Sequence, residues 1–139
     1  MKTYFDEIII STDGHCDIKD ITEETTEIIS KSGLNNGIVT VFATGSTAGI
    51  TTIEYEPGLL KDLPALMNKI APPAGSYRHN ETWGDGNGHS HLRSALIKTS
   101  LTIPFVKGEM TLGTWQQIVF IDFDNRPRTR RIAVQILGE

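Results

Sequence analysis

The sequence has a single cysteine, Cys16, among its 139 residues. A disulfide or a thiolate-rich zinc cluster needs several cysteines, so both are excluded within one chain. Cys16 follows His15, a pairing that would suit a nucleophile and its base. Aspartates on both sides disfavour the thiolate, however, and no third group is in place to orient the histidine. A catalytic cysteine is therefore the weaker interpretation.

Long apolar runs and an excess of positive charge are also absent. No stretch approaches the roughly 20 apolar residues of a membrane span, and the N-terminal segment contains acids where a signal peptide would be apolar. The formal net charge is −4 and the pI is about 5.5, which argues against a general nucleic-acid binder. We therefore expect a cytoplasmic protein with neither a membrane nor a nucleic acid as partner, in which a local patch holds any anionic ligand.

The 38% hydrophobic content is enough for one domain covering residues 1–139. Two segments have helical periodicity. Residues 18–33 place isoleucines on one stripe opposite glutamates and end at Gly33, which suits a C-terminal cap. Residues 62–70, with Pro64 in the first turn, belong to a stretch whose leucines are spaced for one buried face. We expect both helices to pack on the core.

Most of the other segments have strand patterns, with β-branched or alternating apolar residues between turn signals. Strands are predicted over residues 2–11, 38–43, 50–55, 97–103, 110–112, 115–123 and 128–137. One or two helical turns are expected over residues 93–96, and Trp115 is expected to pack against the sheet. The pattern predicts a single α+β domain with a largely antiparallel sheet and two main helices.

One polar segment, Tyr77 to Leu92, stands out from this pattern. It contains three of the four histidines and three glycines, and it has no apolar periodicity, so we expect it outside the core. Glycine permits tight turns that bring polar side chains together. Clustered imidazoles and carboxylates suit a divalent metal site or general acid–base chemistry. The alternative is a solvated glycine-rich turn.

The histidines of this segment are the first candidates for chemistry. His79 and His91 are predicted to be catalytic, either as metal ligands or as a base and its partner. His89 is a further metal candidate, although residues two apart diverge at the start of a helix. Because Asn87 looks like a helix cap, we favour His91 over His89. Asp85 and Glu54 are candidate carboxylates for the metal or the base, although Asp85 is explained equally well as a turn residue.

Several residues outside the histidines are candidates for holding a substrate. Glycines bracket Ser46 and Thr47, whose segment could cradle a phosphate or merely connect two strands. Arg128 and Arg130 share a face of the last predicted strand and could bind phosphate, or form a solvated edge or inter-subunit salt bridges. The predicted substrate-binding residues are Ser46, Thr47, Trp83, Asn87, Gln116, Arg128 and Arg130. Trp83 would stack on a pyrimidine-like ring, and Asn87 would contact ligand or cap a helix.

These motifs resemble the YjbQ-like family, UPF0047, known also as the secondary thiamine-phosphate synthase family. The matching residues are Ser46–Ala48, Tyr77–His79, Asn87–Leu92, Ser100, the spaced signature Gly108, Gly113, Thr114, Trp115 and Gln116, and the arginines of the last strand. The resemblance implies a homotrimer with its polar residues in a cleft near the subunit boundary, and Glu54 matches a family acid. It also implies thiamine-phosphate synthesis with release of pyrophosphate, as a side activity.

One position departs from the family pattern. Many members have a histidine where this chain has Gly45. If that histidine binds a metal elsewhere, this chain has lost the ligand, unless His89 compensates or the glycine loop binds an anion instead.

The sequence thus predicts an enzyme that acts on a small phosphorylated substrate, assisted by a divalent metal, zinc or magnesium. The alternative is a trimeric protein that binds a metabolite or metal without catalysis.

Overall fold

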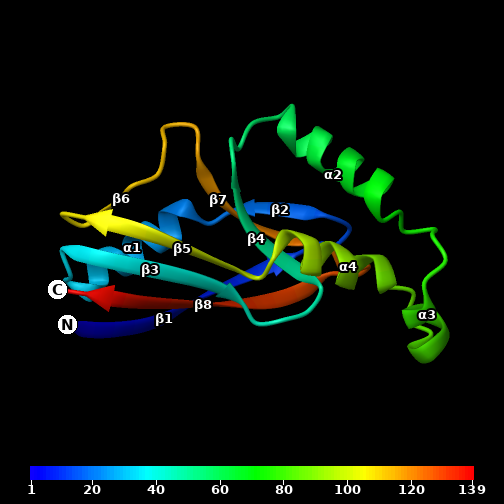
Figure 1. Cartoon of the computed structure of the whole chain (residues 1–139), viewed down its shortest axis with the longest axis horizontal. Helices are drawn as coiled ribbons and strands as arrows, with labels where there is room; N and C mark the ends of the chain where they lie inside the picture. The colour runs from blue at the N-terminus through cyan, green and yellow to red at the C-terminus, as the bar shows by residue number, and fades with distance from the viewer.

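The computed structural model describes all 139 residues and contains two antiparallel sheets and four helices (Figure 1). None of the helices is long and apolar enough to cross a bilayer. In chain order the elements are β1 (Lys2–Thr12), β2 (Asp17–Asp20), α1 (Thr22–Ser32), β3 (Asn36–Ala43), β4 (Ala48–Ile53), α2 (Leu59–Ile70), α3 (Arg78–Trp83), α4 (Gly88–Ile97), β5 (Ser100–Val106), β6 (Glu109–Met110), β7 (Gln117–Asp122) and β8 (Arg128–Gly138).

The two sheets differ in size and face each other. The larger has five strands in the order β1-β8-β3-β5-β6, and the smaller has three in the order β2-β7-β4. Every strand pairing is antiparallel. The predicted α+β fold with a largely antiparallel sheet is therefore confirmed. Helices α3 and α4 add to the two main helices that the periodicity predicts.

Strand β7 shows how the core is divided. Its side chains alternate, so that Ile118 and Phe120 join the main core between the two sheets and α1. Val119 and Ile121 point the other way, into a second cluster that includes Met67 of α2. The smaller sheet is thus buried on both faces, and the residues that follow its central strand are held rigidly.

The first predicted helix begins later than expected. Residues 17–20 form strand β2, because Ile18 pairs with Ile121 of β7 and is buried against it. Helix α1 starts at Thr22 and ends at Gly33, which has the left-handed conformation that the C-terminal cap requires. The prediction of a helix from residue 18 was wrong because tertiary pairing overrides local periodicity.

Helix α2 begins earlier than expected, at Leu59 instead of residue 62. The Glu56 carboxylate accepts hydrogen bonds from the backbone N–H groups of Gly58 and Leu59, which caps the helix without a conventional N-cap side chain. Pro64 consequently lies inside the helix and not in its first turn.

The apolar stripe of α2 is only in part the core face that the sequence predicts, since Leu60, Leu63 and Met67 pack on the second cluster. Met67 is buried, whereas Leu66 and Ile70 are 49% and 54% exposed. Trp115, expected to pack against the sheet, is 72% exposed and lies in the loop before β7. These apolar side chains have no partner within one chain.

Helix α4 replaces the start of a predicted strand. It runs from Gly88 to Ile97, so β5 begins only at Ser100. The helix packs on β4 at Gly49, where an added Cβ would lie 2.8 Å from Cγ2 of Ile97. Glycine is therefore required for this close approach, which holds α4 over the end of the smaller sheet.

Candidate functional site

Two buried carboxylates at the end of β7 organise the candidate site. Asp122 and Asp124 are both 0% exposed. Alternation along β7 puts Asp122 on the same face as Phe120, pointing toward the larger sheet. An uncompensated carboxylate at such a depth would be very costly, so each must have charged or hydrogen-bonding partners.

Asp122 is paired with Arg130 of β8. Nε and Nη2 of Arg130 donate to the two carboxylate oxygens at 2.7 and 2.8 Å, a bidentate contact. The hydroxyl of Thr12 and the backbone N–H of Asp124 also donate to Asp122. Burial by itself would raise the pKa of Asp122, but the hydrogen bonds from Arg130, Thr12 and Asp124 hold that pKa below its usual range.

Asp124 is held by donors from three directions. Nε of Arg128 lies 2.7 Å from Oδ2, the Thr47 hydroxyl donates to the same oxygen, and Nδ2 of Asn87 lies 3.4 Å from Oδ1. The backbone N–H of Asn125 donates to Oδ1 as well. Burial would raise the pKa of Asp124, but Asn125 and Arg128 outweigh it and keep that pKa low. Both aspartates are therefore carboxylates at neutral pH.

Arg128 and Arg130 share one face of β8, as the two-residue period predicts, but neither is a free cation. Each is paired with a buried aspartate of the same chain. Arg130 also donates from Nη2 to the Thr47 hydroxyl. Its remaining nitrogen, Nη1, points toward Gly45, where an added Cβ would lie 3.1 Å away. Nη1 of Arg130 thus has no hydrogen-bond acceptor in the protein, and a larger residue at position 45 would crowd it.

The structure brings together His79 of α3 and His91 of α4. Their ring centroids are 4.3 Å apart with a tilt of 54° between the planes. Nε2 of His79 lies 3.1 Å from Oδ1 of Asn87 and 3.8 Å from Oδ1 of Asp85. Both imidazoles are partly exposed, which makes them accessible to a ligand. Four of the predicted site residues therefore form one cluster.

His89 points away from this cluster, as expected for residues two apart at a helix start. It is 3% exposed, its ring lies 6.3 Å from that of Tyr77, and its Nδ1 has no hydrogen-bond partner. Burial, with smaller contributions from Arg93 and His15, lowers the pKa of His89. A neutral, enclosed imidazole of this kind is not available to a ligand in the pocket beside Gly45.

The expectation that the whole polar segment lies outside the core was wrong. The start of α4 is inserted over the end of β7, where the Ser90 hydroxyl donates to the backbone oxygen of Phe123. Asn87 and His89 are buried beside this contact. The segment is polar because it meets polar groups at the end of the sheet, and not because water surrounds it.

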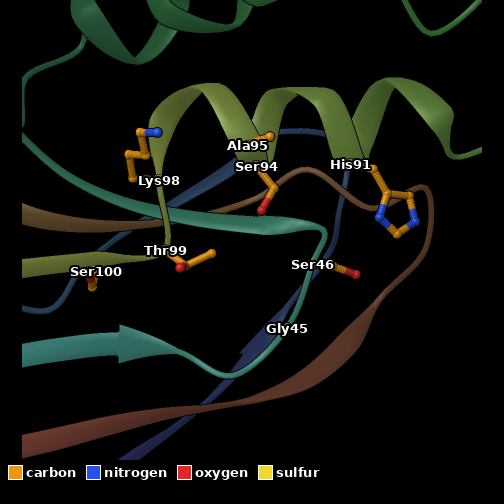
Figure 2. Close-up of a pocket in the computed structure, with 8 residues that line it drawn as sticks. All are labelled: Gly45, Ser46, His91, Ser94, Ala95, Lys98, Thr99 and Ser100. Atoms are coloured by element: carbon orange, nitrogen blue, oxygen red, sulfur yellow. The ribbon is translucent and has the colours of Figure 1, made fainter.

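A pocket of about 400 Å³ opens between α4 and the Gly45–Ser46 segment, with His91 at one side. Figure 2 shows that the side chain of Thr99 points into this space and that Lys98 points away from Ser46 and His91. The Ser94 hydroxyl is directed at β4, where it donates to the backbone oxygen of Ala48. The lining residues are Gly45, Ser46, His91, Ser94, Ala95, Lys98, Thr99 and Ser100. Small hydroxyl groups dominate the lining, which suits hydrogen bonding to a polar ligand.

Two predicted site residues lie at the opposite end of the smaller sheet. Ala48 of β4 pairs with Asp122, whereas Ile53 pairs with Gln117. Glu54 and Gln116 therefore lie about 20 Å along the strands from the carboxylate network. Within one chain they cannot act on the same small molecule as the histidine pair.

Trp83, predicted to stack on a substrate ring, is 73% exposed at the end of α3. It does not line the pocket beside His91. Within one chain, no aromatic side chain is available in that pocket to stack on a heterocycle.

No three side chains of histidine, cysteine, aspartate or glutamate converge as a metal site would require. His79, His91 and Asp85 come nearest, but Nε2 of His79 is directed at Asn87. In this arrangement the three side chains do not supply the three converging ligands that a catalytic metal ion needs. Cys16 is buried, which raises the pKa of its thiol to about 11.

The most buried polar residues of the site, Asp122 and Asp124, are missing from the sequence prediction. The signal was present: an Asp-Phe-Asp sequence follows directly on the apolar run 118–121. Acids at the end of a buried apolar strand need charged or hydrogen-bonding partners. Arg128 and Arg130, which share one face of the next strand, are the cations nearest in sequence. Interpreting residues 124–127 only as a turn concealed this pairing.

We expect Asp122→Asn to lower the free energy of unfolding by about 3–5 kcal/mol, because Arg130, whose side chain is only 12% exposed, would lose its bidentate counter-charge and keep only the Asp124 carboxylate at 3.8 Å. The folded-state pKa of Asp122 is lowered, so its contribution is present above the ordinary carboxyl pKa and lost as the pH falls through the lower folded value. Urea unfolding at pH 7 and near pH 3 measures both effects; the difference between the variant and the native protein should shrink in acid.

Glu7→Gln is the matched control, since Glu7 forms an exposed ion pair with Arg131 at 2.8 Å. It should cost less than about 1 kcal/mol. Equal losses for the two substitutions would show that the Asp122 pair has no special role in stability.

Comparison with known proteins supports one family assignment. The chain is 39% identical over 139 residues to a UPF0047 protein of Methanothermobacter thermautotrophicus, which covers 100% of this chain and 95% of the relative. It is 34% identical to a UPF0047 protein of Archaeoglobus fulgidus, over 94% of this chain and 99% of that one.

A crystal structure of a YbjQ-like protein of unknown function from Sulfolobus solfataricus has the same fold, with a TM-score of 0.94, 37% identity and 99% coverage of both chains. A hypothetical protein from Aeropyrum pernix superposes with a TM-score of 0.91 at 33% identity over 100% of both chains. Residues 6–139 match the family described as UPF0047 protein YjbQ-like. This chain therefore belongs to the YjbQ-like (UPF0047) family.

Proposed function

We propose that the chain is an enzyme that acts on a small phosphorylated substrate in the pocket between α4 and the Gly45–Ser46 segment. The observation that carries this proposal is that His91, which packs against His79, lines a hydroxyl-containing pocket of about 400 Å³. Pockets of this size hold single small molecules. Partly exposed imidazoles packed together in a polar cluster are suited to proton transfer near neutral pH.

The anionic part of the substrate would lie against Gly45 and Ser46. Nη1 of Arg130 is directed there and has no protein acceptor, and glycine at position 45 leaves room beside it. The Ser46 and Thr99 hydroxyls add hydrogen-bond donors. Although the net charge of the chain is −4, the Arg130 guanidinium would bind an anion at this place. Its ion pair with Asp122 fixes its position.

The first reaction to test is thiamine-phosphate synthesis. The thiazole nitrogen attacks the methylene carbon of the pyrimidine diphosphate, a carbon–nitrogen bond forms, the carbon–oxygen bond breaks, and pyrophosphate leaves with the bonding electrons. In our scheme Arg130 stabilises the departing pyrophosphate, and the imidazole pair passes a proton from solvent to a pyrophosphate oxygen, since the thiazole nitrogen has none to give. A divalent metal, zinc or magnesium, stays a prediction and no step here depends on it.

Under this proposal, His91→Ala and His79→Ala should each lower kcat by about 10²–10⁴-fold while the protein stays folded, since each removes a proton-transfer group. The assay supplies the pyrimidine diphosphate and thiazole phosphate and measures pyrophosphate release. His15→Ala is the matched control, because His15 is exposed and lies outside the imidazole pair; its rate should not change.

Other outcomes would contradict the catalytic proposal. If the native protein binds these phosphates without turnover, and the two variants lose that affinity, the chain is a metabolite-binding protein. If both variants only lower stability, the histidine pair is structural.

We further propose that the protein assembles as a homotrimer. Two separate apolar surfaces are uncovered in one chain: the outer face of the larger sheet, with Phe5, Ile9 and Phe42, and the exposed side of α2, with Leu66 and Ile70. Exposed apolar groups on two different faces favour a head-to-tail contact between copies, which closes into a ring when the rotation allows it.

A ring of this kind would also bring residues of one copy close to the pocket of its neighbour. Glu54 and Gln116 are far from the histidine pair within one chain. A pocket near a subunit boundary can take side chains from two copies, so the Glu54 and Gln116 of a neighbouring copy could approach it.

We expect the double substitution Leu66→Glu and Ile70→Glu to convert the trimer into monomers, because it places charges on the apolar side of α2. Sedimentation velocity measures the mass. Lys61→Glu lies on the same helix, is exposed and is the matched control, which should stay trimeric. A native protein that sediments as a monomer, or a double variant that remains trimeric, contradicts this assembly.

A further inference from the structure

Asn87 occupies the N-cap position of α4 but does not cap the helix. Its side chain makes no hydrogen bond to the backbone N–H groups of the first turn. Oδ1 of Asn80, from α3, accepts the hydrogen bond of the Gly88 N–H at 2.9 Å instead. An N-cap asparagine normally stabilises a helix by about 1 kcal/mol. The Asn87 side chain forms hydrogen bonds to two other side chains instead.

The Asn87 amide lies between a carboxylate and an imidazole. Its Nδ2 is 3.4 Å from Oδ1 of Asp124 and its Oδ1 is 3.1 Å from Nε2 of His79. Every other partner of Asp124 is a donor: the Arg128 guanidinium, the Thr47 hydroxyl and a backbone N–H. A carboxylate only accepts, so the amide must present its NH₂ group to Asp124. The reversed amide would place two oxygens against each other.

This orientation determines which nitrogen of His79 carries the proton. With Oδ1 of Asn87 facing it, Nε2 must be the donor. Oδ1 of Asp85, 3.8 Å from the same nitrogen, is a second acceptor that favours the same form. In a neutral imidazole protonated at Nε2, the lone pair is on Nδ1.

We infer that Asn87 is a positioning residue that holds His79 in the Nε2–H form through the chain Arg128, Asp124, Asn87, His79, and so makes Nδ1 the proton acceptor. The tautomer follows from these contacts alone. Only the use of Nδ1 as the base rests on the proposed function. Asn87 would therefore act through His79 instead of contacting the substrate.

The test is nuclear magnetic resonance of protein labelled with ¹⁵N-histidine, at a pH where His79 is neutral. Long-range ¹⁵N–¹H correlations report which ring nitrogen carries the proton, without any substrate. We expect His79 to be protonated on Nε2 with a slowly exchanging N–H signal. In Asn87→Ala the exchange of that proton should accelerate about tenfold, the effect of losing one hydrogen bond of ordinary net strength.

Two further variants separate positioning from a merely structural role. Asn87→Asp keeps an acceptor for His79 but loses the donor to Asp124, so it should retain the Nε2–H signal at some cost in stability. Asn125→Ala removes a neighbouring amide that donates to the Asp85 backbone and does not touch His79, and it should leave the signal unchanged.

The inference is overturned if His79 in the native protein carries its proton on Nδ1, or if Asn87→Ala leaves both tautomer and exchange unaltered. The native measurement stands even if a variant fails to fold. An Nε2–H tautomer in a protein without turnover would leave the positioning intact and reject only the proposed function.

Discussion

The burial of two carboxylates at the end of β7 is the constraint on which the rest of the site depends. Asp122 and Asp124 are excluded from water, so each must be surrounded by donors. Arg128 and Arg130 supply the positive charge. Asp122 holds the guanidinium of Arg130 in a bidentate contact. These pairs join the two sheets at one end. Replacing either arginine would leave a buried carboxylate without its nearest counter-charge, which is strongly destabilising.

This buried network determines how the side chains nearer the solvent are oriented. Asp124 orients the Asn87 amide, and the amide orients His79 beside His91. Asp122 holds Arg130 so that one nitrogen reaches toward Gly45. Glycine at position 45 thus has a physical consequence, since a side chain there would crowd the guanidinium. A rigid buried layer under a polar pocket is the arrangement that preorganised binding requires.

Sequence reasoning predicted the family, the fold class and the proximity of His79 and His91, because apolar periodicity and dense polar motifs are local signals. It failed where pairing at long range decides the outcome. Ile18 joins a strand because Ile121 lies beside it, and Leu66 is exposed because nothing in one chain covers that side of α2. Asp122 and Asp124 were overlooked because acids are assumed to be solvated unless a partner is known. Glu54 and Gln116 were grouped with the site by motif, although the register of β4 separates them from it.

The most direct test of the central claim is a titration of ¹⁵N-histidine-labelled protein with inorganic pyrophosphate, followed by the ring signals of each histidine. If the pocket beside the imidazole pair binds the anionic part of a substrate, the signals of His79 and His91 shift in a saturable way while that of exposed His15 does not. If millimolar pyrophosphate moves none of them, or moves only His15, the pocket is not a phosphate site and the account of the histidine pair is contradicted.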